Sequence, residues 1–243
     1  AEIGIDGVQF HDDDAVPDMN NMTEKQIIDY AKDVKAELDK YGLFAEFVAP
    51  RLWFDKRTND GGFTASLKED RDFAMWRAQR SCDIAAALGT NKIQLWLARE
   101  GTLCAESKDP VQKIGQLIDS IDDMLTYDDK IKVLIESKPN EPIDRSYCGT
   151  IGHVMAVSAA SKDPKRVGAV LESAHAILAG GLGVEIGIAV GLLAEHLIPA
   201  LAGGEGLQGR DAAQKQQCGK QQSERSFHRG DSFPMGFLHP SNE

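Results

Sequence analysis

The stretch Lys132-Val133-Leu134-Ile135-Glu136-Ser137-Lys138-Pro139-Asn140-Glu141-Pro142 begins as an apolar run and ends in an acid, a lysine and a second acid. The run predicts a buried β-strand. Because side chains alternate between the two faces of a strand, Glu136 and Lys138 point the same way from its carboxyl end. A carboxylate and an ammonium in one cavity are costly unless a metal ion or an anionic oxygen lies between them. The pattern indicates a reactive site, and the alternative is an ordinary salt bridge in the loop after a strand.

Strand-like runs and helical periodicities alternate along the rest of the chain, and polar residues gather after the strands. Further strands are expected at Gly7–Phe10, Phe44–Val48, Lys92–Trp96 and Val167–Leu171. Helices are expected after the capping box Thr23-Glu24-Lys25-Gln26, over Lys68–Leu88, from Pro110 to about Leu125, and over His153–Ala160. This is the pattern of an α/β protein with a parallel sheet and a site at its carboxyl edge, of which the (β/α) barrel is the commonest large form.

Composition narrows the classes of function. The chain has 243 residues, 42% of them hydrophobic, and a formal net charge of -11. Since binding a nucleic-acid backbone needs a basic face, this charge argues against a nucleic-acid partner. The four cysteines show no CxxC spacing, so neither a zinc ribbon nor a disulfide framework is indicated, and a reducing cytoplasm is the simplest location.

A histidine and an aspartate follow the first strand. His11 and Asp14 are three residues apart, a spacing at which the carboxylate can hold the imidazole in one tautomer and raise its basicity. Asp12, between them, is interpreted as a solvated or helix-capping acid.

Glu172 and His175 follow the last of these strands. Their spacing lets a strand-end carboxylate and a neutral imidazole approach one divalent cation. With Glu136 from the preceding strand they form a set that suits magnesium, manganese or cobalt better than a structural zinc. Each residue alone is more often a surface group or a satisfied core group. Their position at successive strand ends favours a shared site.

A series of motifs carries a resemblance. The motifs are Phe10-His11-Asp12-Asp13-Asp14, Asp60-Gly61-Gly62-Phe63-Thr64, Trp96 with Arg99-Glu100-Gly101, Ile135-Glu136 with Lys138-Pro139-Asn140-Glu141-Pro142, Thr150-Ile151-Gly152-His153, and Glu172 with His175. In order and approximate spacing they resemble those of xylose isomerases, within the xylose isomerase-like TIM-barrel superfamily. The likeness extends from near Ala1 to about Gly180, and more weakly to around Leu197.

The resemblance implies a metal-dependent aldose-ketose isomerase of the xylose-to-xylulose type, which works by a metal-assisted 1,2-hydride shift with two divalent cations (magnesium, manganese or cobalt). On this basis Glu136 and Glu172 would bind the first cation. Glu172 would bridge to the second, whose other protein ligand would be His175. Glu141 would be a supporting acid near the metal site.

The resemblance also implies roles around the sugar. His11, oriented by Asp14, would help to open the cyclic sugar, and Lys138 would donate a hydrogen bond to the carbonyl oxygen of the open chain. Trp53 and Trp96 would wall the pocket and keep water from the migrating hydride. Trp53 stands where the family is expected to have phenylalanine, which indicates a pocket shaped for a different sugar.

The ends of the chain depart from the family pattern. The expected fold is a partial (β/α)8 TIM barrel that lacks its first strand and has a divergent C-terminal end. The catalytic domain would cover residues 1–203, and residues 204–243 would be a low-complexity, disordered tail. The apolar segment Ala176–Ala202 is expected to be a buried barrel helix and strand, because Glu185, Glu195 and His196 interrupt it as a membrane span. The family's later metal-binding acids are absent, and Ala200 and Leu201 stand in the region of the next one.

Two classes of function stay open at this point. The first is the sugar isomerase, impaired if the missing ligands are essential. The second is a non-catalytic barrel fragment with weak metal or sugar binding. Sugar-phosphate epimerases and apurinic-site endonucleases of the same superfamily are disfavoured by the Lys138–Pro142 context, and the endonucleases also by the charge. The expected partner is a small aldose, with no nucleic acid and no membrane. A complete barrel would form a homo-oligomer, because the resembling family forms tetramers.

Overall fold

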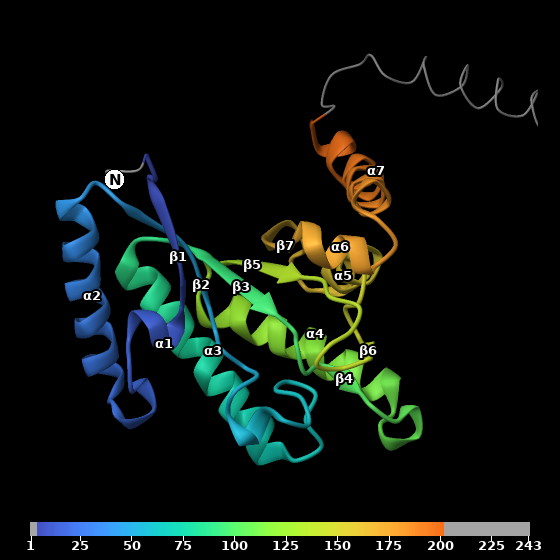
Figure 1. The fold of residues 1–243 in the computed structure, drawn as a ribbon, viewed down its shortest axis with the longest axis horizontal. Helices are drawn as coiled ribbons and strands as arrows, with labels where there is room; N and C mark the ends of the chain where they lie inside the picture. Colours follow the sequence, from blue (N-terminus) through green and yellow to red (C-terminus); the bar gives the residue numbers. More distant parts are fainter. Residues whose placement is uncertain (1–3, 202–243) are drawn as a thin grey trace, which may run out of the picture. The chain divides into compact units, whose positions relative to one another are not determined.

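A computed structural model of the chain describes residues 4–201. The chain divides into two compact units, Ala1–Leu192 and Leu193–Glu243, and the sheet lies in the first. Its five parallel strands lie in the order β1-β2-β3-β5-β7 and fan out with a twist (Figure 1). They are β1 (Gly7–His11), β2 (Phe44–Ala49), β3 (Lys92–Trp96), β5 (Lys132–Glu136) and β7 (Val167–Val170). Each of the five strands expected between Gly7 and Leu171 is present, to within one residue at either end.

Helices connect the strands. They are α1 (Asp12–Ala15), α2 (Glu24–Lys40), α3 (Lys68–Leu88), α4 (Pro110–Tyr127), α5 (Ile151–Ala160), α6 (Ser173–Leu178) and α7 (Leu182–Leu201). Single-turn 3₁₀ helices cover Met19–Asn21, Lys56–Thr58, Ala105–Ser107 and Pro164–Arg166, and β4 (Gly101–Thr102) pairs with β6 (Arg145–Ser146) as a short antiparallel ribbon. The expected capping box at Thr23 is formed, and α3 ends at Gly89 in the left-handed conformation, with φ of 82°.

The core lies between the sheet and the helices α2 to α5, which contact one another in sequence order. Ile93 and Leu95 of β3 and Val133 and Ile135 of β5 are completely buried. This burial holds the strands in one register, because a slip by one residue would turn these side chains to the opposite face. Within the described residues β1 and β7 are the edges of an open sheet. The expected α/β fold and partial barrel are therefore confirmed, whereas the expected tail, residues 204–243, lies outside the described residues.

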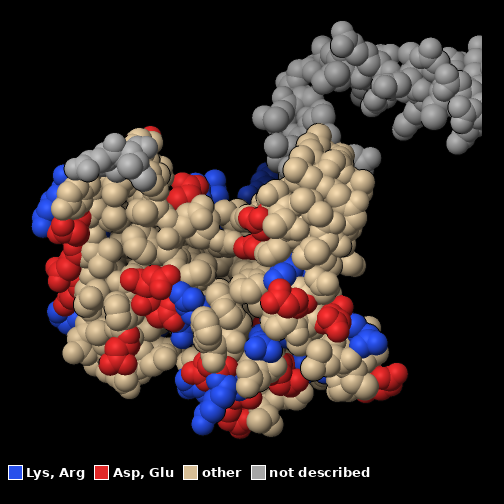
Figure 2. Space-filling model, viewed as in Figure 1, with Lys and Arg blue, Asp and Glu red and all other residues tan. Residues whose placement is uncertain are grey.

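The segment after β7 differs from the expectation of a buried helix and strand. It forms the two helices α6 and α7, separated by Gly180 and Gly181 with φ values of 123° and 128°. Several apolar residues of α7, among them Val184 and Val190, are exposed, and Figure 2 shows a largely uncharged surface there. The expected strand is wrong because this run keeps helical hydrogen bonding from Leu182 onward. No helix among the described residues is both long and apolar enough to cross a membrane.

Asp12 also differs from its interpretation as a solvated or capping acid. Its side chain is completely buried and bonds Arg77 of α3 through two contacts of 2.7 Å. Ser81 donates a further hydrogen bond of 3.2 Å. The solvated reading is wrong because α3 brings a buried guanidinium against the start of α1, and a buried charge needs such a partner. This pair fixes the carboxyl end of β1 to the helical layer.

Glu100 joins two of the sequence motifs. It is 2% exposed, and its carboxylate accepts hydrogen bonds from the backbone N–H groups of Gly62, Phe63 and Thr64 at 2.8 to 2.9 Å, and from the Thr64 hydroxyl. Lys108 supports the same loop by bonding Asp60 and the Gly101 carbonyl. The loop after β2 is therefore held by a buried acid in the loop after β3.

We expect Glu100→Gln to destabilise the protein by about 2–4 kcal/mol, because an amide offers one acceptor oxygen where four donors converge on a carboxylate. Urea unfolding measures the effect. Glu69→Gln, at an exposed position in the first turn of α3, is the matched control and should cost about 1 kcal/mol at most, through the loss of one charge at the helix N-terminus. A Glu100→Gln midpoint equal to that of the wild type would show that the carboxylate does not hold the loop.

Candidate functional site

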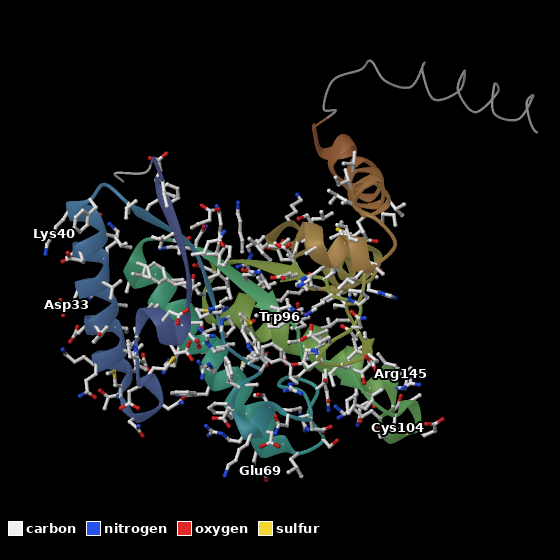
Figure 3. The ribbon with its side chains drawn as sticks, viewed as in Figure 1. Asp33, Lys40, Glu69, Trp96, Cys104 and Arg145 are labelled. Atoms are coloured by element: carbon white, nitrogen blue, oxygen red, sulfur yellow. The ribbon has the colours of Figure 1, made fainter. Side chains whose placement is uncertain are left out.

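The register of the sheet places the candidate residues at one edge, the one formed by the carboxyl ends of the strands. Trp96 pairs with Glu136, and Glu136 with Val170, so the last residues of β3, β5 and β7 lie side by side. His11 ends β1, where it pairs with Ala49 of β2. Figure 3 shows Trp96 at the carboxyl end of β3, among the side chains that gather there. This is the edge at which parallel α/β folds form their sites.

Glu136 and His175 form the centre of the group. Nδ1 of His175 lies 3.0 Å from Oε1 of Glu136, and both side chains are largely buried, with 17% and 12% exposed. The geometry of this contact is not that of a hydrogen bond, and among residues 4–201 the buried Nδ1 has no hydrogen-bond partner. Gln94 of β3 donates a hydrogen bond to the other oxygen of Glu136. The pair therefore keeps the capacity to bind a third group.

Glu172 affects the pKa values of Glu136 and His175. It is the N-cap of α6, where its Oε1 accepts a hydrogen bond of 3.0 Å from Ala174 N–H. Burial, and then the charge of Glu172, raise the pKa of Glu136 to about 7. Burial, and then the charge of Lys138, lower the pKa of His175, so its imidazole is neutral at pH 7. Glu136 and the neutral imidazole of His175 are thus adjacent, and Glu172 lies near enough for its charge to act on both.

The donor chemistry of Glu136, Glu172 and His175 fits a divalent cation. A cation would offset the burial of the Glu136 charge and its repulsion by Glu172, which together raise the pKa of Glu136, and would give the buried Nδ1 of His175 a partner. The described part of the chain contains no cluster of three or more His, Cys, Asp or Glu side chains already arranged around one point. The expected metal residues are therefore neighbours, and their side chains are not arranged as a preformed site.

Lys138 and Trp96 lie beside this cluster. Nζ of Lys138 is 5.1 Å from the centroid of Trp96 and 2.5 Å from a carboxylate oxygen of Glu141. The Lys138 side chain is 12% exposed, whereas that of Glu141 is 80% exposed. Glu141, expected to support the metal site, thus bonds Lys138, and its own pKa is held below the usual value by that lysine. The Trp96 ring stacks on His175 with centroids 6.3 Å apart.

His11, Asp14 and Trp53 complete the group. Nδ1 of His11 is 3.1 Å from Oδ2 of Asp14, which is the pairing that the spacing predicted. The ring of His11 meets Trp53 edge to face at 5.2 Å between centroids, and Trp53 meets Trp96 at 4.5 Å. Aromatic contacts therefore connect the His11 side of the site to the Glu136 side. The structure brings all nine expected residues to one edge, and the roles assigned to them stay predictions.

Two residues of the site are missed by the sequence reasoning. Gln94 lies two positions before Trp96 and so on the same face of β3, and this alternation is the signal that could have found it. Arg51 bonds Asp13 at 2.7 Å and Asp14 at 2.9 Å. No spacing rule pairs residues so distant in sequence, so no local signal indicates Arg51.

Comparisons with known proteins agree with this architecture. The profile of the family described as xylose isomerase-like TIM barrel matches residues 1–202. Among solved structures, a xylose isomerase domain protein from Planctomyces limnophilus has a TM-score of 0.57 at 17% identity, over 79% of this chain and 63% of that one. D-psicose 3-epimerase from Clostridium cellulolyticum H10 has a TM-score of 0.58 at 13% identity, over 77% and 61%. An AP endonuclease of family 2 from Brucella melitensis has 0.56 at 16%, over 81% and 66%.

These similarities show the fold. The chain spans less than two thirds of the length of each of these structures.

We expect the contribution of Glu136 to the stability of the protein to fall as pH rises between about pH 5 and about pH 8. The pKa of Glu136 is raised from 4.5 to about 7 in the folded state, so the folded state binds more protons than the unfolded state in this window and loses stability as they leave. Thermal unfolding across this range measures the effect in metal-free buffer. Glu136→Gln, which cannot titrate, should flatten the profile relative to Glu69→Gln. Profiles of equal slope in the two variants would contradict the assignment.

Proposed function

The chain belongs to the xylose isomerase-like TIM barrel family, and from this premise we propose that it supplies the active site of a metal-dependent aldose-ketose isomerase of the xylose-to-xylulose type. The observation that carries the proposal is the meeting of Glu136, His175, Lys138 and Trp96 at one strand edge. These are a carboxylate, a neutral imidazole, an ammonium and an aromatic wall, which together suit a polar, uncharged substrate.

We propose that Glu136, Glu172 and His175 hold divalent cations, of the kind of Mg²⁺, Mn²⁺ or Co²⁺. When bound, such a cation acts as a Lewis acid that polarises substrate oxygen atoms. Glu136 must lose its proton to serve as a ligand, so its pKa of about 7 makes cation affinity rise with pH. Two cations are the number that the family resemblance implies.

The protein side chains would act in sequence on the sugar. With Nδ1 of His11 facing Asp14, its Nε2 is left to exchange a proton with the cyclic sugar as the ring opens. Lys138 then donates a hydrogen bond to the carbonyl oxygen of the open chain, where negative charge develops. Trp53 and Trp96 exclude water while hydrogen moves with its electron pair from C2 to C1. The aldose carbonyl at C1 is reduced, C2 is oxidised, and the proton of the C2 hydroxyl passes to the oxygen on C1, so no other reactant is needed.

A second candidate is a sugar epimerase that works by proton transfer. The pKa of Glu136, about 7, favours it, because a general base is most effective when its pKa lies near the working pH. The two candidates differ in the fate of hydrogen at C2. A hydride shift retains a deuterium label from C2 in the product, whereas proton transfer releases it to water. A chain that binds sugar or metal weakly and does neither would be the non-catalytic fragment.

The partner that we propose is an uncharged aldose. The cytoplasm is the proposed location, supported by the free thiols of Cys82, Cys104 and Cys148. A homo-oligomer is proposed on the resemblance to the family alone.

We expect Lys138→Met to lower kcat for xylose by about 10²-fold or more, because a donor to the developing negative charge is lost in a largely buried site. Lys165→Met, at an exposed lysine outside the site, should retain full activity. The assay follows ketose formation with Mg²⁺, Mn²⁺ or Co²⁺, and mass analysis of product from C2-deuterated xylose identifies the hydrogen transfer. Absence of turnover by the wild type with all three cations would contradict the isomerase, and full activity of Lys138→Met would contradict the role of the lysine.

A further inference from the structure

The three consecutive aspartates after β1 have different partners. Asp12 is buried on Arg77 of α3. Asp13 lies between two arginines, 3.0 Å from Arg77 and 2.7 Å from Arg51. Asp14 bonds Arg51 at 2.9 Å. A chain of alternating acids and guanidinium groups thus runs from the core to the site.

Arg51 is held from several sides. Its Nε bonds Asp13, its Nη2 bonds Asp14, and its backbone N–H donates to Asp12 at 3.2 Å. The guanidinium also lies 5.7 Å from the ring centroid of Trp53, within the range of a cation–π contact. Only 18% of this side chain is exposed. The residue is therefore fixed in place more firmly than a surface arginine.

Arg51 and His11 both bond the same carboxylate oxygen of Asp14. Oδ2 of Asp14 is 2.9 Å from Nη2 of Arg51 and 3.1 Å from Nδ1 of His11. Asp14 is 57% exposed, and in the described residues these two side chains are its hydrogen-bond partners. An exposed carboxylate bonded by the histidine alone would be free to rotate. With Arg51 present it has one orientation.

Trp53 is the second link between Arg51 and His11. The rings of His11 and Trp53 meet edge to face at 5.2 Å between centroids, and Arg51 lies over the same indole. Arg51 thus contacts both groups that hold the imidazole, the carboxylate at Nδ1 and the aromatic wall beside the ring. No substrate contact of its own is needed for this effect.

We infer that Arg51 is a positioning residue, which holds Asp14 and Trp53 and thereby fixes the tautomer and orientation of His11. The guanidinium suits this task because its planar fork bonds two carboxylates at once while its face packs on an aromatic ring. A lysine offers a single ammonium and cannot hold Asp13 and Asp14 in the same geometry. Arg51 is connected through Asp13 and Arg77 to buried Asp12, so the residue that holds Asp14 and Trp53 is itself anchored in the core.

The first test measures the tautomer of His11 directly and needs no turnover. Nitrogen-15 NMR of the histidine side chains is recorded for the wild type, Arg51→Gln, Arg51→Lys and the control Arg57→Gln. Arg57 lies in the same loop and pairs with Asp55 at 2.7 Å outside the site. We expect one Nδ1-protonated form of His11 in the wild type and the control, and a mixture of tautomers in both Arg51 variants. A single unchanged form in the Arg51 variants would overturn the inference, whatever the activity.

The second test rests on the proposed function and uses a substrate that needs no ring opening. Xylose exists mainly as a ring, whereas the triose glyceraldehyde is too short to form a five- or six-membered hemiacetal. If Arg51 acts through His11 in ring opening, Arg51→Gln should lower kcat/KM for xylose about 10-fold more than for glyceraldehyde. Equal losses on both sugars would indicate a merely structural role and overturn the inference. A wild type inactive on both overturns the proposed function instead, and the NMR result then decides on Arg51 alone.

Discussion

The in-register pairing of buried parallel strands is the constraint on which the site depends. Completely buried residues of β3 and β5 face the helical layer, so their register cannot slip without exposing them. The same register aligns Trp96, Glu136 and the end of β7 at one edge. Residues separated by dozens of positions in sequence therefore meet in space because the core behind them is apolar and closely packed.

Electrostatics at this edge divide into two parts. On one side Glu136 lies buried beside neutral His175, and burial, followed by the charge of nearby Glu172, raises its pKa. On the other side each acid that follows His11 has an arginine partner, and the charges are satisfied. The first part is suited to bind a cation and the second to hold a histidine still. Aromatic contacts between Trp53 and Trp96 join the two.

Most of this architecture follows from local sequence signals. Alternation of apolar runs and helical periodicities predicts the strands and their parallel arrangement, and polar residues after each strand predict the edge at which His11 and Glu136 lie. The sequence does not predict the burial of Asp12, because its partner Arg77 is distant in sequence and only the packing of α3 brings the two together. Arg51 and Glu100 were missed as structural residues for the same reason. The prediction of a strand after β7 is wrong because apolar composition alone does not distinguish a buried strand from a helix such as α7.

Paramagnetic broadening by Mn²⁺ tests the shared site most directly, because the three tryptophans of the chain report on it separately. Trp96 stacks on His175, Trp53 contacts Trp96, and Trp76 packs on Phe73 in α3. As Mn²⁺ is added to nitrogen-15-labelled protein, the indole signal of Trp96 should broaden first, that of Trp53 next, and that of Trp76 least. Broadening of Trp76 as early as that of Trp96, or equal sharp signals from all three at saturating Mn²⁺, would contradict a cation site at this edge of the sheet.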